Sequence, residues 1–182
     1  VRQASFNGVS IMTGTGYVSA NFSAWGGFAT TILLIVMFIG GCGGSTTCGI
    51  KVFRLQVLAG TAKVQISRLL RPHAVVLAYY NKRPVSVEVM DSVMGFFYLF
   101  ILGFALIAIM LGIAGLDFVT ALSGAATSIS NVGPGLGEVI GADGNFSTLP
   151  NSAKWIMSFA MLLGRLEIFT VLVMLNPAFW QR

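Results

Sequence analysis

Two short glycine-containing segments carry the residues best suited to handle an ion. Residues 13–17 read Thr-Gly-Thr-Gly-Tyr, and residues 130–134 read Ser-Asn-Val-Gly-Pro. Glycine permits backbone angles that turn successive carbonyl oxygens toward one axis, where they can replace the hydration shell of a cation. Carbonyl rings of this kind suit a large, easily dehydrated monovalent cation. The two segments therefore predict a selectivity filter.

The two segments belong to an internal repeat. Residues 21–23 and residues 145–147 both read Asn-Phe-Ser, and each triplet follows one of the glycine segments. The copies are 117 residues apart at the glycine segments and 124 apart at the triplets, so seven extra residues lie in the second copy. Each triplet is also a glycosylation sequon, but matching parts of a repeat need no such explanation. The repeat predicts that both copies build the same unit.

A third glycine-rich stretch, residues 40–49, interrupts an apolar run. The run before it, residues 28–39, has twelve residues. As a helix it would be about 18 Å long, too short to cross a hydrocarbon core of about 30 Å. Helical periodicity resumes at Ile50 and continues to about Leu70. Such a pattern indicates a discontinuous helix that lines a transport pathway; an ordinary surface loop is the alternative.

Arg165 is the remaining candidate. Together with Glu167 it interrupts the otherwise uncharged apolar run 155–180. A charge about 20 Å into a membrane helix is costly and usually functional. Glu167 is not a partner on the same helix, because residues two apart point away from each other. In the repeat register Arg165 aligns with Gly41, so the arginine and the glycine-rich stretch should form one constriction. The alternative is a buried ion pair with a residue outside this sequence.

These candidates need elements that hold them in a membrane. Of the 182 residues, 55% are hydrophobic and 9% are charged, whereas soluble domains carry about a quarter charged residues. We therefore expect an all-α membrane protein built from a unit of outer helix, re-entrant pore helix, glycine turn and inner helix. The second copy would place these helices near residues 89–116, 118–129 and 152–175. The first copy would lack its outer helix and have a broken inner helix.

The charges predict how the chain is oriented. Seven of the eleven Lys and Arg residues fall within residues 51–83, which contain no acid. This is typical of a cytoplasmic loop, and a nucleic-acid-binding patch would need a soluble module that the sequence does not show. Asp117, Glu138 and Asp143 would lie on the opposite face, where they raise the local cation concentration. We expect a multi-pass protein with residues 51–83 and the C-terminus in the cytoplasm.

The sequence does not suggest an enzyme. Residues 44–49 resemble a phosphate-binding loop, but Ile50 stands where a lysine must follow the glycine. His73, the single histidine, has no nucleophile and base beside it in the sequence. Cys42 and Cys48 suggest neither a disulfide framework nor a zinc site.

The candidate residues resemble those of a known family. Residues 13–17 are similar to the Thr-Val-Gly-Tyr core of potassium-channel filters. Residues 131–137 (Asn-Val-Gly-Pro-Gly-Leu-Gly), 40–49 and 164–167 (Gly-Arg-Leu-Glu) resemble the Trk/Ktr/HKT superfamily of potassium transporters. The resemblance covers essentially the whole chain and is greatest to the last two of four pore-loop repeats in bacterial Trk-type membrane subunits.

The resemblance implies a potassium-channel-like architecture, of which one and a half to two of four repeats are present. Residues 1–71 would form the third repeat without its outer helix, 72–88 a basic cytoplasmic linker, and 89–182 the fourth repeat. The missing N-terminal half of the same chain would complete the pore. Further implications are a bacterial inner-membrane location, a homodimer in contact with lipid, and a cytosolic regulatory ring subunit that binds a nucleotide of the NAD or ATP/ADP type.

The resemblance also implies potassium uptake across the inner membrane, with specific roles for the candidate residues. The residues implied to bind K⁺ at the filter are Thr15, Gly16, Val132 and Gly133, with Gly14 and Asn131 just below them. The residues implied to form a gate are Gly40, Gly41, Gly43, Gly44, Ser45, Thr46, Thr47 and Gly49. Arg165 would project into the pore as a barrier. No covalent cofactor and no transition metal is implied.

Three alternatives stay open. A sodium-permeable member of the superfamily is distinguished by serine in place of a filter glycine, so Gly16 and Gly133 favour potassium. A symporter coupled to protons or sodium is the second alternative. A non-conducting accessory subunit is the third; it accounts for the hydrophobicity but not for paired glycine turns at membrane depth.

Overall fold

The computed structural model describes residues 1–71, 76–166, 168–175 and 177–180; His73 and Glu167 lie outside them. Within these residues the elements are helices joined by turns and loops, with one short hairpin. The first copy contains α1 (Arg2–Met12), η1 (Phe22–Trp25), α2 (Gly27–Phe38) and α3 (Val52–Leu70). The hairpin consists of β1 (Tyr79–Tyr80) and β2 (Arg83–Pro84). The second copy contains α4 (Val87–Ile113), α5 (Phe118–Ser130), η2 (Phe146–Thr148), α6 (Asn151–Arg165), α7 (Ile168–Leu175) and α8 (Pro177–Trp180).

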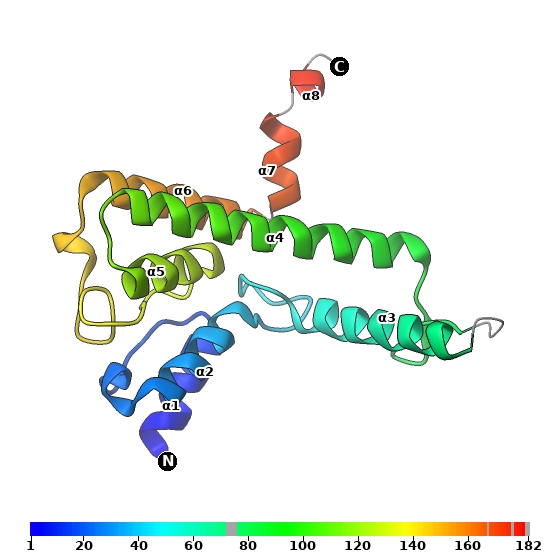
Figure 1. Cartoon of the computed structure of the whole chain (residues 1–182), viewed down its shortest axis with the longest axis horizontal. Helices are drawn as coiled ribbons and strands as arrows, with labels where there is room; N and C mark the ends of the chain where they lie inside the picture. Colours follow the sequence, from blue (N-terminus) through cyan, green and yellow to red (C-terminus); the bar gives the residue numbers. More distant parts are fainter. Residues whose placement is uncertain (72–75, 167, 176, 181–182) are drawn as a thin grey trace.

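The order of elements is the same in the two copies (Figure 1). In each, a pore helix (α1 or α5) ends at a glycine turn, a 3₁₀ helix follows, and an inner helix (α2 or α6) begins. Asn21 and Asn145 cap the two 3₁₀ helices, because their side-chain oxygens accept from the amides of Ser23 at 3.0 Å and Ser147 at 2.9 Å. The repeated Asn-Phe-Ser triplet thus has one structural role in both copies.

Helix α4 extends along the length of the molecule, with α3 packed beside its first half and α5 beside its second (Figure 1). Among the described residues it is the one helix long and apolar enough to cross a membrane. Its 27 residues correspond to about 40 Å. The expected outer helix, 89–116, and pore helix, 118–129, agree with α4 and α5 to within a few residues.

The segment before α4 was expected to be a linker, but it contains a short β-hairpin. Within the expected linker 72–88, the described residues form the β1–β2 hairpin, and α4 begins at Val87. Asn81 and Lys82 both have positive φ, 47° and 63°. These are the angles of a type I′ turn, which matches the twist of a two-stranded hairpin.

The expectation of one continuous inner helix over 152–175 is wrong. Helix α6 ends at Arg165, and α7 begins at Ile168 and runs in a different direction (Figure 1). A Cβ at Gly164 would lie 1.9 Å from the carbonyl oxygen of Ile129, so the last turn of α6 rests directly on α5. Ile168, at the start of α7, lies against α4 and joins the core.

The core lies where the two copies meet. One cluster is formed by α4, α5 and α6, and the other by α1, α2 and the residues that follow α5. Phe38 of α2 joins them, since its ring stands edge-on to Phe104 of α4 with centroids 5.0 Å apart. This packing fixes the position of the first glycine turn relative to the second.

Candidate functional site: two glycine turns above a loop and an arginine

The backbone of the two glycine turns, residues 13–17 and 130–134, follows the same unusual pattern. Gly14 and Gly16 have φ values of +67° and +76°, and the equivalent residues Asn131 and Gly133 have +52° and +114°. Left-handed angles at every second residue allow neighbouring peptide groups to point to one side. Asn131 is the one residue of the four with a side chain, and asparagine tolerates the left-handed region better than most residues.

The amides of the turns are bonded back to the pore helices. Thr15 N donates to Ser10 O at 3.0 Å, and Val132 N donates to Thr127 O at 3.0 Å. The next amides repeat the pattern: Gly16 N donates to Ser10 O at 3.3 Å, and Gly133 N donates to Thr127 Oγ1 at 2.9 Å. Ser10 and Thr127 are 117 residues apart, as the glycine segments are. Each pore helix therefore orients the peptide groups of its own turn.

The two turns lie directly against each other. A Cβ at Gly16 would stand 2.4 Å from Val132 O, a separation that no side chain tolerates. Gly14 and Gly133 face the opposite turn more loosely, with Cβ positions 3.7 Å from Asn131 O and from Gly16 Cα. The structure thus brings together the six residues predicted for the filter: Gly14, Thr15, Gly16, Asn131, Val132 and Gly133.

Both pore helices end at the turns, which gives this region a favourable field for a cation. The C-terminus of an α-helix carries a partial negative charge, equivalent to about half an elementary charge. Helix α1 ends at Met12 and α5 at Ser130, immediately before the two turns. The partial negative charges at the C-termini of the two helices together favour a cation at the glycine turns.

Polar side chains buried in the pore helices support the residues after each turn. Asn7 is fully buried, and its Oδ1 accepts from Ser19 N at 3.0 Å. In the second copy Ser123 Oγ accepts from Leu136 N at 3.0 Å. These supports were not predicted from the sequence: the 117-residue spacing aligns the supported residues Ser19 and Leu136, but it places Gly124, and not Ser123, opposite Asn7.

The loop 40–49 is fastened at its two ends and lies beneath the first turn. Gly40 N donates to Ile50 O at 2.9 Å, and Ile50 N donates to Phe38 O at 2.8 Å, which closes the loop at its base. Gly40 lies against the returning chain, since a Cβ there would be 2.4 Å from Cys48 O. At the far side, Thr47 Oγ1 donates to Thr13 O at 3.2 Å. The loop therefore touches the base of a glycine turn.

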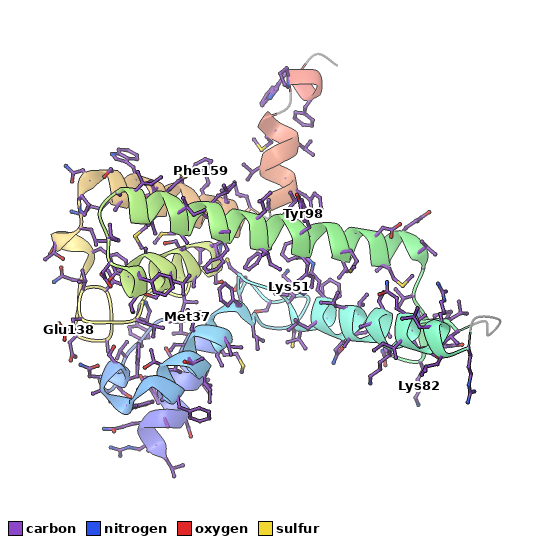
Figure 2. The ribbon with its side chains drawn as sticks, viewed as in Figure 1. Met37, Lys51, Lys82, Tyr98, Glu138 and Phe159 are labelled. Carbon is purple, nitrogen blue, oxygen red and sulfur yellow. The ribbon has the colours of Figure 1, made fainter. Side chains whose placement is uncertain are left out.

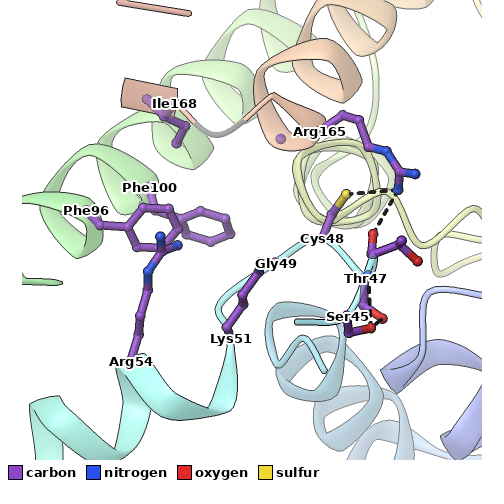
Figure 3. Close-up of a pocket in the computed structure, with 12 residues that line it drawn as sticks. Ser45, Thr47, Cys48, Gly49, Lys51, Arg54, Phe96, Phe100, Arg165 and Ile168 are labelled. Carbon is purple, nitrogen blue, oxygen red and sulfur yellow. Dashed lines mark hydrogen bonds between the residues drawn. The ribbon is translucent and has the colours of Figure 1, made fainter. Parts of the chain in front are cut away.

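Arg165 meets the same loop from the opposite copy. Its Nη1 donates to Thr46 O at 2.9 Å and lies 3.6 Å from Cys48 Sγ (Figure 3). These residues line a cavity of about 250 Å³ between the loop, α4 and the end of α6. Arg54 lies on the other side of the cavity, with its guanidinium 3.8 Å from the centre of the Phe96 ring. The arginine and the loop are thus in contact, while the role of Arg165 as a barrier stays a prediction.

Glu88 and Asp91 lie at the start of α4, whereas Asp117, Glu138 and Asp143 come after its C-terminal end. Figure 2 shows Glu138 at this end of the molecule and Lys82 at the other. Asn21 Nδ2 donates to Asp143 Oδ2 at 2.6 Å, which links the two copies. Asp117 caps α5 by accepting from Thr120 N at 3.2 Å. Hydrogen bonds from the side chain and then the amide of Thr120 hold the pKa of Asp117 below its ordinary value.

This arrangement defines an all-α membrane protein in which repeated pore helices present glycine turns to one another. The chain belongs to the TrkH family, whose model, described as "Cation transport protein", matches residues 1–182. It is therefore a member of a transporter family and not of an enzyme family.

Individual members of the family are similar over nearly the whole chain. The Trk system potassium uptake protein TrkI of Halomonas elongata is 48% identical over 99% of this chain and 37% of its own length. The protein TrkH of Escherichia coli is 37% identical over 100% of this chain and 37% of its length. The crystal structure of the potassium transporter TrkH from Vibrio parahaemolyticus superimposes with a TM-score of 0.89 at 39% identity, covering 98% of this chain and 37% of that one. The chain thus spans little more than a third of each of these relatives.

Proposed function

We propose that this chain supplies two of the filter segments through which a full-length transporter takes up potassium. The observation that carries the proposal is the paired backbone pattern: left-handed angles at Gly14 and Gly16 and, 117 residues later, at Asn131 and Gly133. The relatives that match the chain bear the name Trk system potassium uptake protein. Backbone carbonyls replace the hydration shell of K⁺ in a filter of this kind.

In the proposed pathway an ion passes the turns and then meets the loop 40–49 with Arg165. The loop is a movable gate, and its contact with the arginine closes the path. A fixed positive charge beside the path opposes a cation by about 2 kcal/mol at 8 Å and an effective dielectric constant of about 20. Movement of the loop away from Thr13 would open the way from the filter to the cytoplasmic side.

The proposed arrangement in the cell follows from the charges and from the family. Residues 1–71 and 89–182 are the third and fourth of four pore-loop repeats, and residues 51–83 face the cytoplasm of a bacterium across its inner membrane. The full-length protein pairs as a homodimer and binds a cytosolic ring subunit that reads a nucleotide. The acids near the glycine turns then face outward and attract cations to the entrance.

The proposal is tested by reconstituting the full-length protein in liposomes and measuring rubidium and potassium uptake with sodium as competitor. We expect rubidium uptake that excess potassium abolishes and equal sodium leaves nearly unchanged. Equal competition by sodium would favour the sodium-permeable alternative, and dependence on a proton or sodium gradient would favour a symporter. A well-folded protein without flux would favour the accessory subunit.

A further inference from the structure

Thr47 is the residue through which the loop 40–49 touches the first glycine turn. Its Oγ1 lies 3.2 Å from Thr13 O and 2.8 Å from Ser45 Oγ. A carbonyl oxygen only accepts, so the single hydroxyl hydrogen of Thr47 points to Thr13. Ser45 is then the donor in its bond with Thr47, and it accepts in turn from Thr47 N at 3.2 Å. This pair of bonds aims the Thr47 hydroxyl at the Thr13 carbonyl.

The Thr13 carbonyl is a favourable place for a cation. Thr13 is the C-cap of α1, so its oxygen is among the carbonyls at the negative end of the helix dipole. It precedes Gly14, the first left-handed residue of the turn, and it is bonded to the loop below. A cation that leaves the glycine turn toward the loop therefore passes this oxygen.

The Thr47 side chain occupies the space beside that oxygen. Its methyl carbon Cγ2 would lie 3.5 Å from a Cβ at Gly14, which is van der Waals contact with the base of the turn. A cation bound to Thr13 O would need this space and would face the positive end of the Thr47 O–H dipole. Occupation by the ion and occupation by the hydroxyl therefore exclude each other.

We propose that Thr47 is a latch that holds the loop closed on the Thr13 carbonyl, and that a potassium ion arriving at this oxygen releases it. The inference deepens the proposed function and rests on it, since it assigns a residue and an ion dependence to the gate. Thr47 is a positioning residue: it acts on the loop, and the filter itself selects the ion. The transported ion thereby takes part in opening its own path.

The first test compares Thr47→Val with Thr47→Ser in the full-length protein in liposomes. Valine keeps the shape and removes the donor, whereas serine keeps the donor. Loss of one hydrogen bond should raise the basal potassium flux of Thr47→Val about fivefold, equivalent to about 1 kcal/mol. Thr47→Ser should stay within about twofold of the wild type, since its donor is retained, and both should keep the wild-type preference for potassium over sodium. Equal flux in the three proteins, or equal rises in both variants, would overturn the latch.

The second test follows the loop directly and leaves residue 47 unchanged. Cys48 is adjacent to Thr47 and lies against Arg165, so its accessibility reports the position of the loop. In full-length protein with Cys48 as the sole cysteine, we expect its reaction with a water-soluble methanethiosulfonate to speed up as KCl replaces choline chloride. A rate independent of potassium contradicts release by the ion. A protein that carries no potassium at all overturns the proposed function as well, which separates the two failures.

Discussion

At the residue scale, the contacts of Arg165 connect the two copies. Its guanidinium donates to the carbonyl of Thr46, a residue of the loop in the other copy. Removing the side chain therefore has two effects: it takes away a positive charge, and it frees a loop carbonyl. Both effects act in the same direction if the loop is a gate.

We expect Arg165→Ala to raise potassium flux by an order of magnitude or more in the full-length protein, because a barrier of about 2 kcal/mol corresponds to about thirtyfold in rate. Arg165→Lys keeps the charge and should change flux far less. Flux and melting temperature are measured on the same purified variants. A destabilised Arg165→Ala variant with wild-type or lower flux would instead indicate that the arginine belongs to a buried ion pair.

The glycine turns could be predicted from the sequence at the residue scale, but the contacts between them could not. Repetition and spacing identified Gly16 and Gly133 as equivalent. That Gly16 lies against Val132 O depends on how the two copies pack, and no local pattern specifies it. The bond from Thr47 to Thr13 was missed for the same reason, since the two residues are 34 apart and meet only in the folded chain.

At the element scale, the length of an apolar run did not predict where the inner helix of the second copy ends. The run 155–180 predicted one helix because it is apolar on both sides of its two charges, Arg165 and Glu167, and neither charge by itself ends a helix. The repeat contained the missing signal. At the 124-residue spacing Gly164 corresponds to Gly40, which comes two residues after the end of the first inner helix at Phe38. Both glycines lie against a carbonyl of another segment, so both inner helices break near the same place in the unit.

Asp117 offers a test of the pore helix α5. Its carboxylate caps the helix, and its pKa is lowered, so its stabilising effect is present above the ordinary pKa of about 3.9 and is lost as the pH falls through the lower folded value. We expect Asp117→Ala to lose about 1 kcal/mol of stability at pH 7. Asp117→Asn keeps a capping oxygen and should lose much less.

Melting temperatures of the three proteins in detergent, followed from pH 7 downward, measure this effect. The difference between wild type and Asp117→Ala should shrink as the acid protonates, while that between Asp117→Asn and Asp117→Ala should stay nearly constant. A difference between wild type and Asp117→Ala that does not depend on pH would show that the charge on Asp117 does not stabilise α5.

At the scale of the whole molecule, the distribution of charge separates two ends. Basic residues gather on α3 and the β1–β2 hairpin, and the acids near the glycine turns lie at the opposite end of α4. Arg68 also braces the hairpin side of α3, since its Nη2 donates to Val76 O at 3.3 Å. Under the proposed function, we expect the cytosolic subunit to dock on this basic end.

Charge reversal tests the docking surface. Arg68→Glu with Arg71→Glu should weaken co-purification of the cytosolic subunit, and more strongly at higher salt, because the remaining attraction is screened. Lys154→Glu, at the start of α6 in the other part of the molecule, is the matched control and should leave the complex intact. Retention of the complex by the double variant at every salt concentration would argue against docking at this surface.

The central claim is that the paired glycine turns select potassium, and the potassium-over-sodium permeability ratio of Gly16→Ser and Gly133→Ser tests it most directly. Serine at residue 16 collides with Val132 O, and serine at residue 133 must adopt a φ of +114°. Gly112, exposed in α4 with open space around it, supplies the control Gly112→Ser. In liposomes containing the full-length protein we predict that both turn variants lose most of the preference, by about tenfold or more for a disturbance of about 1.4 kcal/mol, while the control retains it. Unchanged ratios in both turn variants, with normal folding and flux, would contradict the claim.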